Sequence, residues 1–426
     1  METPELKIPR DSMVKRFLKY VQIDTQSSEE SQSYPSTEKQ LNLSRLLLEE
    51  LNAMGVEARL TAHGYVFATL PSNLPEDHSH EVPPIGLIAH VDTSPDVSGA
   101  NVKPVIHKNY DGGLITLPAD KSQVIDPAEN PALKNCLGHD IITTDGTTLL
   151  GADNKAGVAE IMTALEYLIG HPEIPHGDIK IAFTVDEEVG RGTEHFDLKE
   201  FGAKYAYTID GETAGEIEDE TFCADSAEAR IYGINVHPGF AKSKMVNALK
   251  IAADFLSRLP KDALSPETTE KREGYLHPNT ISGNVELVEI KMLVRDFTVE
   301  GLKEKEKFLE KIRVDVLKDW PKARIDLKVT ESYRNMKYVL EKYPFVTDYA
   351  LEAVRRSGLK PLRNIIRGGT DGARLSFMGL PTPNVFTGGH NFHSKREWIS
   401  ISDMEKAVET ILHLMQIWAE RGEEGQ

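Results

Sequence analysis

The sequence predicts an α/β protein in which a mixed, mostly parallel sheet is interrupted by a second, smaller α+β domain. Through the first half of the chain, apolar strand-like runs alternate with amphipathic helical segments, the order that builds parallel sheets. The pattern changes after about Glu218, where predicted strands alternate apolar with polar residues. Residues of metal-binding type follow five apolar runs, and the last of them, His393, lies beyond this second pattern.

Two helices are predicted before the first strands. Apolar side chains recur at helical spacing over residues 13–21. Thr37 and Gln40 predict a capping box for a helix over residues 41–54, and Gly55 suits its end. Further runs predict strands over residues 56–60, 65–70, 85–89 and 179–185, and a helix over residues 155–169.

The middle of the chain is predicted to form a two-layer domain of its own. Strands are expected over residues 229–236, 283–296 and 324–330, with helices over residues 247–259 and 301–317. Because metal-type ligands resume only beyond this block, we expect it to be inserted into the larger domain. The expected bounds are 1–219 and 332–426 for the catalytic domain, and 220–331 for the insertion.

Composition restricts the class of partner. The chain has 426 residues, 27% of them charged, and a formal net charge of -18. A phosphate backbone requires clustered Lys and Arg, so we expect no nucleic-acid partner and no anionic membrane surface. No stretch approaches the ~20 apolar residues of a membrane span. The N-terminal residues also lack the apolar core of a secretion signal, so a cytoplasmic protein is expected.

The two cysteines, Cys136 and Cys223, are too few for a disulfide framework in a chain of this length. This favours a reducing compartment. Either thiol is chemically able to be a zinc ligand or a nucleophile. Neither has a C-x-x-C partner or an adjacent ligand-type histidine, so we expect both to pack in the core.

Five apolar runs are followed by residues of the kinds that bind metal ions. These residues are His90 with Asp92, Asp153, Asp186 to Glu188, Asp210 with Glu212, and His390 with His393. Loops after the carboxyl ends of parallel strands converge on one crevice, so we expect these residues to meet. Each segment alone has a plainer explanation, as a helix cap does for Asp153. Together they favour two metal ions sharing a carboxylate, and therefore metal-assisted hydrolysis.

The spacing of these residues suggests which of them bind metal and which act as general base or orient a ligand. His90 and Asp92 are two apart, so on a strand both face one side, and Asp92 is expected to accept the second ring N–H of His90. Glu187 and Glu188 are adjacent and point to different sides. One glutamate can therefore bind metal while its neighbour acts as a general base. His393 follows a Gly-Gly turn and is the expected ligand of the last segment.

These segments resemble the M20 family of dinuclear zinc exopeptidases, and within it the tripeptide aminopeptidases. The resemblance covers most of the chain and is most specific over residues 90–96, 145–162, 183–190 and 391–398. It implies a zinc-exopeptidase catalytic domain that releases the N-terminal residue from tripeptides. It further implies two Zn²⁺ per subunit, with Co²⁺ or Mn²⁺ as alternatives, and a homodimer formed through the inserted lid domain.

The resemblance also implies roles for individual residues. His90 and Asp210 would hold one zinc ion, Glu188 and His393 the other, and Asp153 would bridge them. Glu187 would be the general base, and Asp92 would orient His90. The family usually has a second Asp where this chain has Asn154, so were that neighbour the bridge, the assignment of Asp153 would fail.

Substrate contacts are implied for four residues. His237 would stabilise the oxyanion or the carbonyl, and Arg295 would bind the C-terminal carboxylate. Asn279 and Arg367 complete the expected set. A surface ion pair with a neighbour such as Asp296 is the plainer interpretation of Arg295.

Two other functions remain open from the sequence. A related M20 dipeptidase or N-acyl amino-acid deacylase would share the metals and differ in whether the substrate's amine is free. A non-catalytic binding protein would keep the fold, but such a protein has no need of Glu187.

Overall fold

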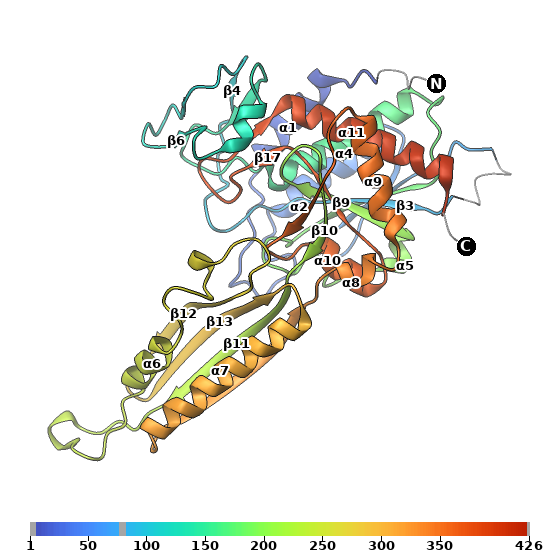
Figure 1. The fold of residues 1–426 in the computed structure, drawn as a ribbon. Coiled ribbons are helices and arrows are strands. Elements are labelled where there is room, and N and C mark those ends of the chain that lie inside the picture. Colours follow the sequence, from blue (N-terminus) through green and yellow to red (C-terminus); the bar gives the residue numbers. More distant parts are fainter. Residues whose placement is uncertain (1–5, 76–81, 424–426) are drawn as a thin grey trace. The chain divides into compact units, whose positions relative to one another are not determined.

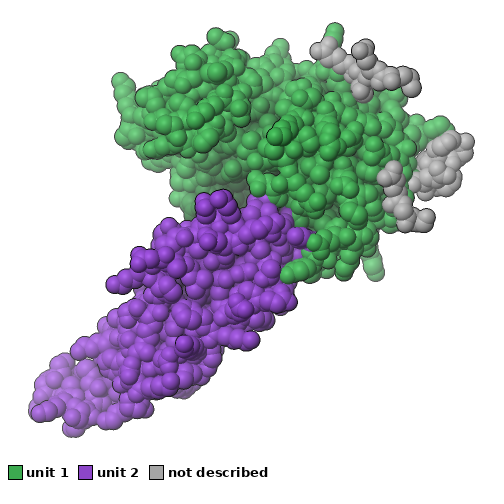
Figure 2. Space-filling model, viewed as in Figure 1, with its two compact units in different colours: residues 1–219, 338–364, 370–426 green, residues 220–337, 365–369 purple. Residues whose placement is uncertain are grey.

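The computed structural model describes residues 6–75 and 82–423, and the chain divides into two compact units (Figure 1, Figure 2). The large unit comprises Met1–Asp219, Tyr338–Asn364 and Thr370–Gln426, and the small unit comprises Glu220–Lys337 and Ile365–Gly369. The sequence placed the insertion at 220–331. In the structure the small unit extends further than predicted, to Lys337, and it also includes Ile365–Gly369.

An eight-stranded mixed sheet forms the centre of the large unit. Its strands, in spatial order, are β1 (Glu57–Leu60), β2 (Val66–Leu70), β8 (Ile179–Thr184), β3 (Ile85–His90), β9 (Tyr205–Gly211), β16 (Asn384–Phe386), β10 (Glu216–Thr221) and β15 (Leu362–Ile366). The four middle strands, β8, β3, β9 and β16, run parallel. Antiparallel pairs flank them, β1 with β2 and β2 with β8 on one side and β10 with β16 on the other. The predicted mixed sheet with a parallel centre is therefore confirmed.

The large unit also contains helices, several of which contact this sheet. They are α1 (Arg10–Val21), α2 (Gln40–Ala53), α4 (Ala152–Gly170), α5 (Leu198–Phe201), α8 (Lys337–Leu340), which begins on the last residue of the small unit, α9 (Pro344–Arg356), α10 (Asp371–Met378) and α11 (Ile401–Arg421). Helix α4 contacts β3 and β9 on one side and α1 and α11 on the other (Figure 1). Burial on both sides explains why α4 is apolar nearly all round rather than along one stripe. None of the described helices is long and apolar enough to cross a membrane.

The capping box predicted for the second helix is wrong. Helix α2 begins at Gln40, and its N-cap Lys39 makes no side-chain capping bond. The Thr37 hydroxyl instead donates to the carbonyl of Gln26 (2.7 Å). The Gln40 amide donates to the buried Asp186 carboxylate (2.6 Å) and accepts from the Asp186 N–H (3.0 Å). Satisfying a buried carboxylate thus takes precedence over capping an exposed helix end.

Short strands that the sequence did not predict form a side structure on the large unit. A four-stranded sheet contains β17 (Gly389–His390), β18 (Trp398–Ser400), β7 (Ile141–Thr143) and β4 (Val105–His107), and β5 (Ile115–Thr116) pairs with β6 (Val124–Ile125). The 3₁₀ helix η1 (Pro131–Asn135) packs its Leu133 into a small core with Trp398 and Cys136.

The small unit has the predicted two layers. Its antiparallel sheet has the order β12 (Tyr275–Gly283), β13 (Leu287–Asp296), β11 (Cys223–Tyr232) and β14 (Arg324–Tyr333). Helices α6 (Ala248–Ser257) and α7 (Val299–Asp319) contact each other and this sheet, and η2 (Pro238–Phe240) and η3 (Pro266–Thr268) lie in its loops. Strand β12 was not predicted because Pro278 interrupts the run of strand-forming residues. An edge strand with an irregular register next to Pro278 accommodates that residue.

Candidate metal centre

Three parallel strands bring their carboxyl ends to one edge of the central sheet. His90 is the last residue of β3 and lies opposite Thr184 at the end of β8. On the other side of β3, Ile88 lies opposite Thr208 of β9, which places Asp210 level with His90. The convergence that the sequence predicted from strand ends is therefore present in the fold.

Asp153 lies between two imidazoles. Its Oδ1 is 2.9 Å from His90 Nε2, and its Oδ2 is 3.2 Å from His393 Nε2. His90 Nε2 is also 3.4 Å from Asp210 Oδ1, and His393 Nε2 is 2.9 Å from Glu188 Oε2. The five residues thus form two groups of three, each with one histidine, that share Asp153.

The backbone around Asp153 directs its carboxylate into this cluster. Gly151 precedes it in the left-handed conformation (φ 83°), and Asp153 itself departs from helical geometry (φ -81°, ψ 105°). The alternative that Asp153 caps the helix is wrong, because regular helical geometry begins only after Asn154 and the Asp153 carboxylate contacts the two histidines. Neighbouring Asn154 turns away and accepts the Gly157 N–H (3.2 Å). Of the two residues, Asp153 is the one that contacts both histidines.

Gly157 allows α4 to lie close to β9. A Cβ atom at this position would come within 1.9 Å of the Ile209 carbonyl oxygen, closer than any side chain can approach. The helix start that carries Asp153 is therefore held next to the strand end that carries Asp210.

Asp92 supports both the histidine and the glutamates. Its carboxylate accepts the backbone N–H groups of Glu187 (3.1 Å) and Glu188 (3.2 Å). His90 Nδ1 lies 3.1 Å from the Asp92 carbonyl oxygen and 3.4 Å from its carboxylate. Asp92 therefore fixes the ring of His90 through its main chain and the glutamate loop through its side chain.

The three consecutive acidic residues after β8 separate into two environments. Asp186 has a positive φ of 60° and faces away from the cluster, where its carboxylate accepts the Ser36 N–H (2.6 Å). Glu187 and Glu188 turn to the other side. The Glu188 side chain is 4% exposed, and its Oε1 has no hydrogen-bond partner among the described residues.

Burial dominates the electrostatics of the cluster. It raises the pKa of Glu187, Glu188 and Asp210, and neighbouring carboxylates add to the effect. Burial opposes the charged form of both histidines, but the surrounding carboxylates outweigh it and raise the pKa of His90 and His393. Without a bound cation, burial and the neighbouring carboxylates therefore favour the protonated form of Glu187 and Glu188.

Three acidic residues beside the cluster were not predicted from the sequence. Glu397 accepts the N–H groups of Leu150 (2.6 Å), Gly151 (2.8 Å) and Asp153 (3.1 Å), so it shapes the turn that carries the shared carboxylate. Burial raises the pKa of Glu397 to about 7.

Asp371 accepts the Thr184 hydroxyl (2.9 Å), and Asp96 lies 3.3 Å from His393 Nδ1. Asp96 and Glu397 lie inside segments 90–96 and 391–398, which carry the family resemblance. Their place in these segments is the sequence feature that could have identified them.

The four predicted substrate contacts all belong to the small unit. His237 is exposed at the N-cap of η2, and Asn279 is exposed at the irregular register of β12. Arg295 donates to the carbonyls of Asp225 and Val294, both at 3.0 Å, rather than to Asp296.

Arg367 donates to main-chain carbonyls of its own unit, Lys271 (2.6 Å) and Glu273 (2.9 Å). The roles of these four residues toward a substrate stay predictions.

A cavity of about 510 Å³ opens beside the cluster in the large unit. It is lined by Glu129, Asn130, Pro131, Ala132, Asp153, Glu212, His390, Asn391, Phe392, His393 and Trp398. His390 stacks on Trp398 (4.3 Å between ring centres), so it forms part of the wall. Two cluster residues, Asp153 and His393, are therefore accessible from this cavity.

A parallel sheet with histidines and carboxylates gathered at its strand ends, next to an open cavity, defines a metal-dependent hydrolase. The chain belongs to peptidase family M20/M25/M40, whose family model matches residues 145–417. This membership confirms the resemblance predicted from the motifs.

Relatives named peptidase T are similar over almost their whole length. The chain is 49% identical to that of Bacillus pumilus, covering 97% of this chain and 100% of the relative, and 50% identical to that of Clostridium perfringens, covering 95% and 98%. Among solved structures, the fold resembles aminopeptidase PepT from Bacillus cereus (TM-score 0.73, 24% identity, 97% and 99% covered). It also resembles a tripeptidase from Staphylococcus aureus (TM-score 0.75, 23% identity, 97% and 99% covered).

Proposed function

We propose that this protein is a dinuclear metallo-aminopeptidase that releases the N-terminal residue from tripeptides. The observation that carries the proposal is the pair of three-residue groups joined by Asp153. One group contains His90 and Asp210, and the other contains His393 and Glu188. The names of the relatives, peptidase T and tripeptidase, support the same activity.

The residues fit a pair of metal ions. Asp153 directs one oxygen toward each histidine, as a bridging carboxylate requires. Glu188 Oε1 is buried without a partner among the described residues, which is a ligand position that the protein does not fill itself. The donors are imidazole and carboxylate groups, which suit Zn²⁺ and also Co²⁺ or Mn²⁺. We propose Zn²⁺ as the ion bound.

Two bound ions would supply the Lewis acidity that activates water and polarises the scissile carbonyl. Glu187 is the general base: its carboxylate takes a proton from the attacking water and delivers it to the nitrogen of the leaving amine. Asp92 holds the main chain of Glu187, so the base has a fixed position relative to His90. Asp92 therefore acts as a positioning residue.

The cavity favours a substrate with a free amine. Glu129 and Glu212 line its wall, and a peptide's α-ammonium group requires an anionic partner. Glu129 lies 3.8 Å from Arg396, and burial raises the pKa of Glu212 to about 7, so a nearby ammonium group would favour its ionised form. An N-acyl amino acid lacks that cation. The aminopeptidase is thereby favoured over the deacylase.

Hydrolysis of a free tripeptide, its N-acetyl form and the corresponding dipeptide tests the substrate class. The chelator-treated protein is assayed with and without added Zn²⁺ or Co²⁺. We expect metal-dependent release of the N-terminal residue from the free tripeptide. Preferential cleavage of the N-acetyl form would instead identify a deacylase, and preferential cleavage of the dipeptide a dipeptidase.

The small unit carries the remaining proposals. We propose that it forms a homodimer interface and supplies His237, Asn279, Arg295 and Arg367 to the substrate. Replacement of Arg295 by Ala should raise KM for a tripeptide more than it lowers kcat if that guanidinium binds the C-terminal carboxylate. Both cysteines are free and buried, which suits the proposed cytoplasmic location.

A further inference from the structure

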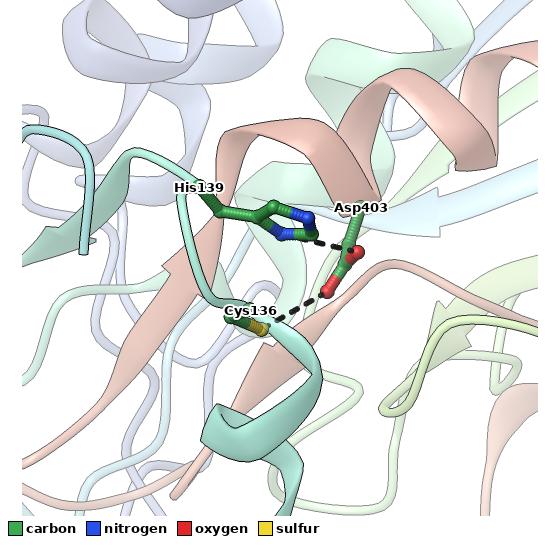
Figure 3. Close-up of side chains that lie close together, drawn as sticks. All are labelled: Cys136, His139 and Asp403. Atoms are coloured by element: carbon green, nitrogen blue, oxygen red, sulfur yellow. Dashed lines mark hydrogen bonds and ion pairs between the residues drawn. The ribbon is translucent and has the colours of Figure 1, made fainter. Parts of the chain in front are cut away.

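A thiol, an imidazole and a carboxylate meet away from the catalytic cluster. Cys136 follows η1, His139 precedes β7, and Asp403 lies in the first turn of α11 (Figure 3). One ligand-type atom from each lies within 4.8 Å of the others. We propose that these three residues form a separate site for a divalent metal ion of the zinc class.

The spacing of the donor atoms is that of metal ligands. Cys136 Sγ lies 3.7 Å from Asp403 Oδ2, and His139 Nδ1 lies 3.8 Å from Asp403 Oδ1. Two ligands bound tetrahedrally at zinc distances are separated by roughly 3.3–3.8 Å. In the metal-free chain the Cys136 thiol donates a hydrogen bond to Asp403 across its distance, whereas the His139–Asp403 separation exceeds an N–H···O hydrogen bond, typically about 2.9 Å. The carboxylate therefore faces both partners at a separation that leaves room for an ion.

The charges also suit a divalent ion. A thiolate and a carboxylate carry two negative charges and the imidazole is neutral, so one M²⁺ balances the set. Binding forms one metal–sulfur bond and releases the thiol proton to solvent, with no change in oxidation state. In the metal-free chain His139 Nδ1 is hydrogen-bonded to the Ser400 hydroxyl (2.9 Å), and an ion bound to this nitrogen would replace that hydrogen bond.

A catalytic role for the thiol fits these residues poorly. Cys136 is 1% exposed, and burial beside Asp403 raises the pKa of its thiol to about 12. A nucleophilic cysteine needs the opposite, an exposed thiol with a lowered pKa. Its hydrogen bond to the Ala132 carbonyl (3.5 Å) is likewise that of a protonated thiol.

A metal at this site would stabilise one wall of the cavity beside the catalytic cluster. Asn130, Pro131 and Ala132 line that cavity at the start of η1, and Trp398 lines it in β18. Cys136 directly follows η1, and Asp403 lies in the first turn of α11, the helix that follows β18. An ion bound to both would tie these two segments together.

Part of this cluster is visible in the sequence as a C-x-x-H pair rather than a C-x-x-C pair. Cys136 and His139 are three residues apart, a spacing common among zinc ligands. The third ligand, Asp403, is 267 residues from Cys136 and becomes its neighbour only in the folded chain. The expectation that Cys136 only packs in the core is thus incomplete.

Cobalt binding to the chelator-treated full-length protein tests the proposal. Co²⁺ bound to a thiolate gives a sulfur-to-metal absorption in the near ultraviolet, which the catalytic cluster cannot give because it contains no sulfur ligand. We expect this absorption in the wild-type protein and expect Cys136→Ser to abolish it. Bound metal should then fall by one ion per chain while two remain.

Cys223→Ala is the matched control, because Cys223 is also free and buried. It should keep both the absorption and the metal content. If Cys136→Ser does not fold, His139→Gln keeps the thiol and should raise the Kd for the sulfur-linked Co²⁺ by at least about tenfold. Absence of the absorption from saturated wild-type protein, its persistence in Cys136→Ser, or an unchanged Kd in His139→Gln would overturn the proposal.

Discussion

Buried carboxylates have different partners in the small unit and in the cluster around Asp153 of the large unit. In the small unit each has a permanent cationic partner: Asp225 pairs with Arg334 (2.7 Å), Asp296 with Lys305, and Glu220 with Arg272. At the edge of the large unit's sheet, Asp153 and Glu188 contact imidazoles instead. Imidazole is a metal ligand as well as a base, so this cluster is built to receive positive charge from outside.

The pKa shifts of Glu220 in the small unit and of Glu188 and Asp210 in the cluster differ in the same sense. Burial opposes ionisation of Glu220, but Arg272 and Lys337 outweigh it and lower its pKa. Burial raises the pKa of Glu188 and Asp210, and neighbouring carboxylates raise it further. Glu220 is therefore neutralised by side chains of the folded chain itself, whereas Glu188 and Asp210 contact imidazoles and, in the proposed function, are neutralised by bound metal ions.

The largest expected effect is on catalysis. Glu187→Gln keeps the shape of the side chain and removes its ability to accept a proton. We expect kcat for a free tripeptide to fall by about 10²–10⁴-fold, while both metal ions stay bound. Steady-state kinetics and metal analysis of the same preparation check this. Turnover at the wild-type rate would exclude Glu187 as the base.

Removing the guanidinium group of Arg334 should leave a buried carboxylate of the small unit without a cation, as in the cluster around Asp153. Arg334→Met leaves Asp225, which is 1% exposed, buried without its guanidinium partner. We expect a loss of about 3–5 kcal/mol in the free energy of unfolding, measured by denaturant titration. The double variant Arg334→Met with Asp225→Asn should recover much of this loss. No recovery would mean that Arg334 acts through packing and not through charge.

Metal removal should give the large unit a distinctive pH dependence. With raised pKa values, Glu188, Asp210 and His393 keep protons in the folded protein that the unfolded chain releases above its own pKa values of about 4–6.5. The folded state then binds more protons, so the stability of the metal-free protein falls as pH rises from 5 to 8.

The slope is about 1.4 kcal/mol per pH unit for each extra proton held. Added Zn²⁺ should flatten it. Thermal unfolding with chelator and with Zn²⁺ at several pH values measures the effect, and parallel pH profiles in the two conditions would contradict the explanation.

A smaller effect is expected from the residue that supports the ligands. Asp92→Ala removes the acceptor of the Glu187 and Glu188 N–H groups and a neighbour of His90. We expect metal affinity to fall by about 10–100-fold, measured by competition with a chelator. Asp145→Asn is a matched control, because that carboxylate bonds locally to Thr147. Equal affinity in the two variants would remove the positioning role from Asp92.

Much of the fold followed from local patterns in the sequence. Apolar runs and helical spacing located β3, β8, α1 and α4 because each of these elements buries a continuous set of side chains. Strands of two or three residues, such as β17 and β7, carry too few residues to show a period. Strand β12 was hidden by Pro278, which only its place at the sheet edge makes acceptable.

The sequence predicted those residues of the candidate site that directly follow a buried strand. His90, Glu188 and Asp210 were found because each follows a buried run, and such runs end at one edge of a parallel sheet. Glu397 and Asp371 do not follow a buried apolar run, so the sequence pattern did not point to them. Glu397 reaches Leu150 across 247 residues of sequence, and contacts of this kind are decided by the tertiary fold.

The central claim is that the cluster around Asp153 holds two metal ions. Anomalous diffraction at the zinc absorption edge, from crystals of Zn²⁺-loaded protein, tests this most directly. We predict two peaks, one contacting His90, Asp153 and Asp210, and the other contacting Asp153, Glu188 and His393. A single peak, or two peaks that do not share Asp153, would contradict this account.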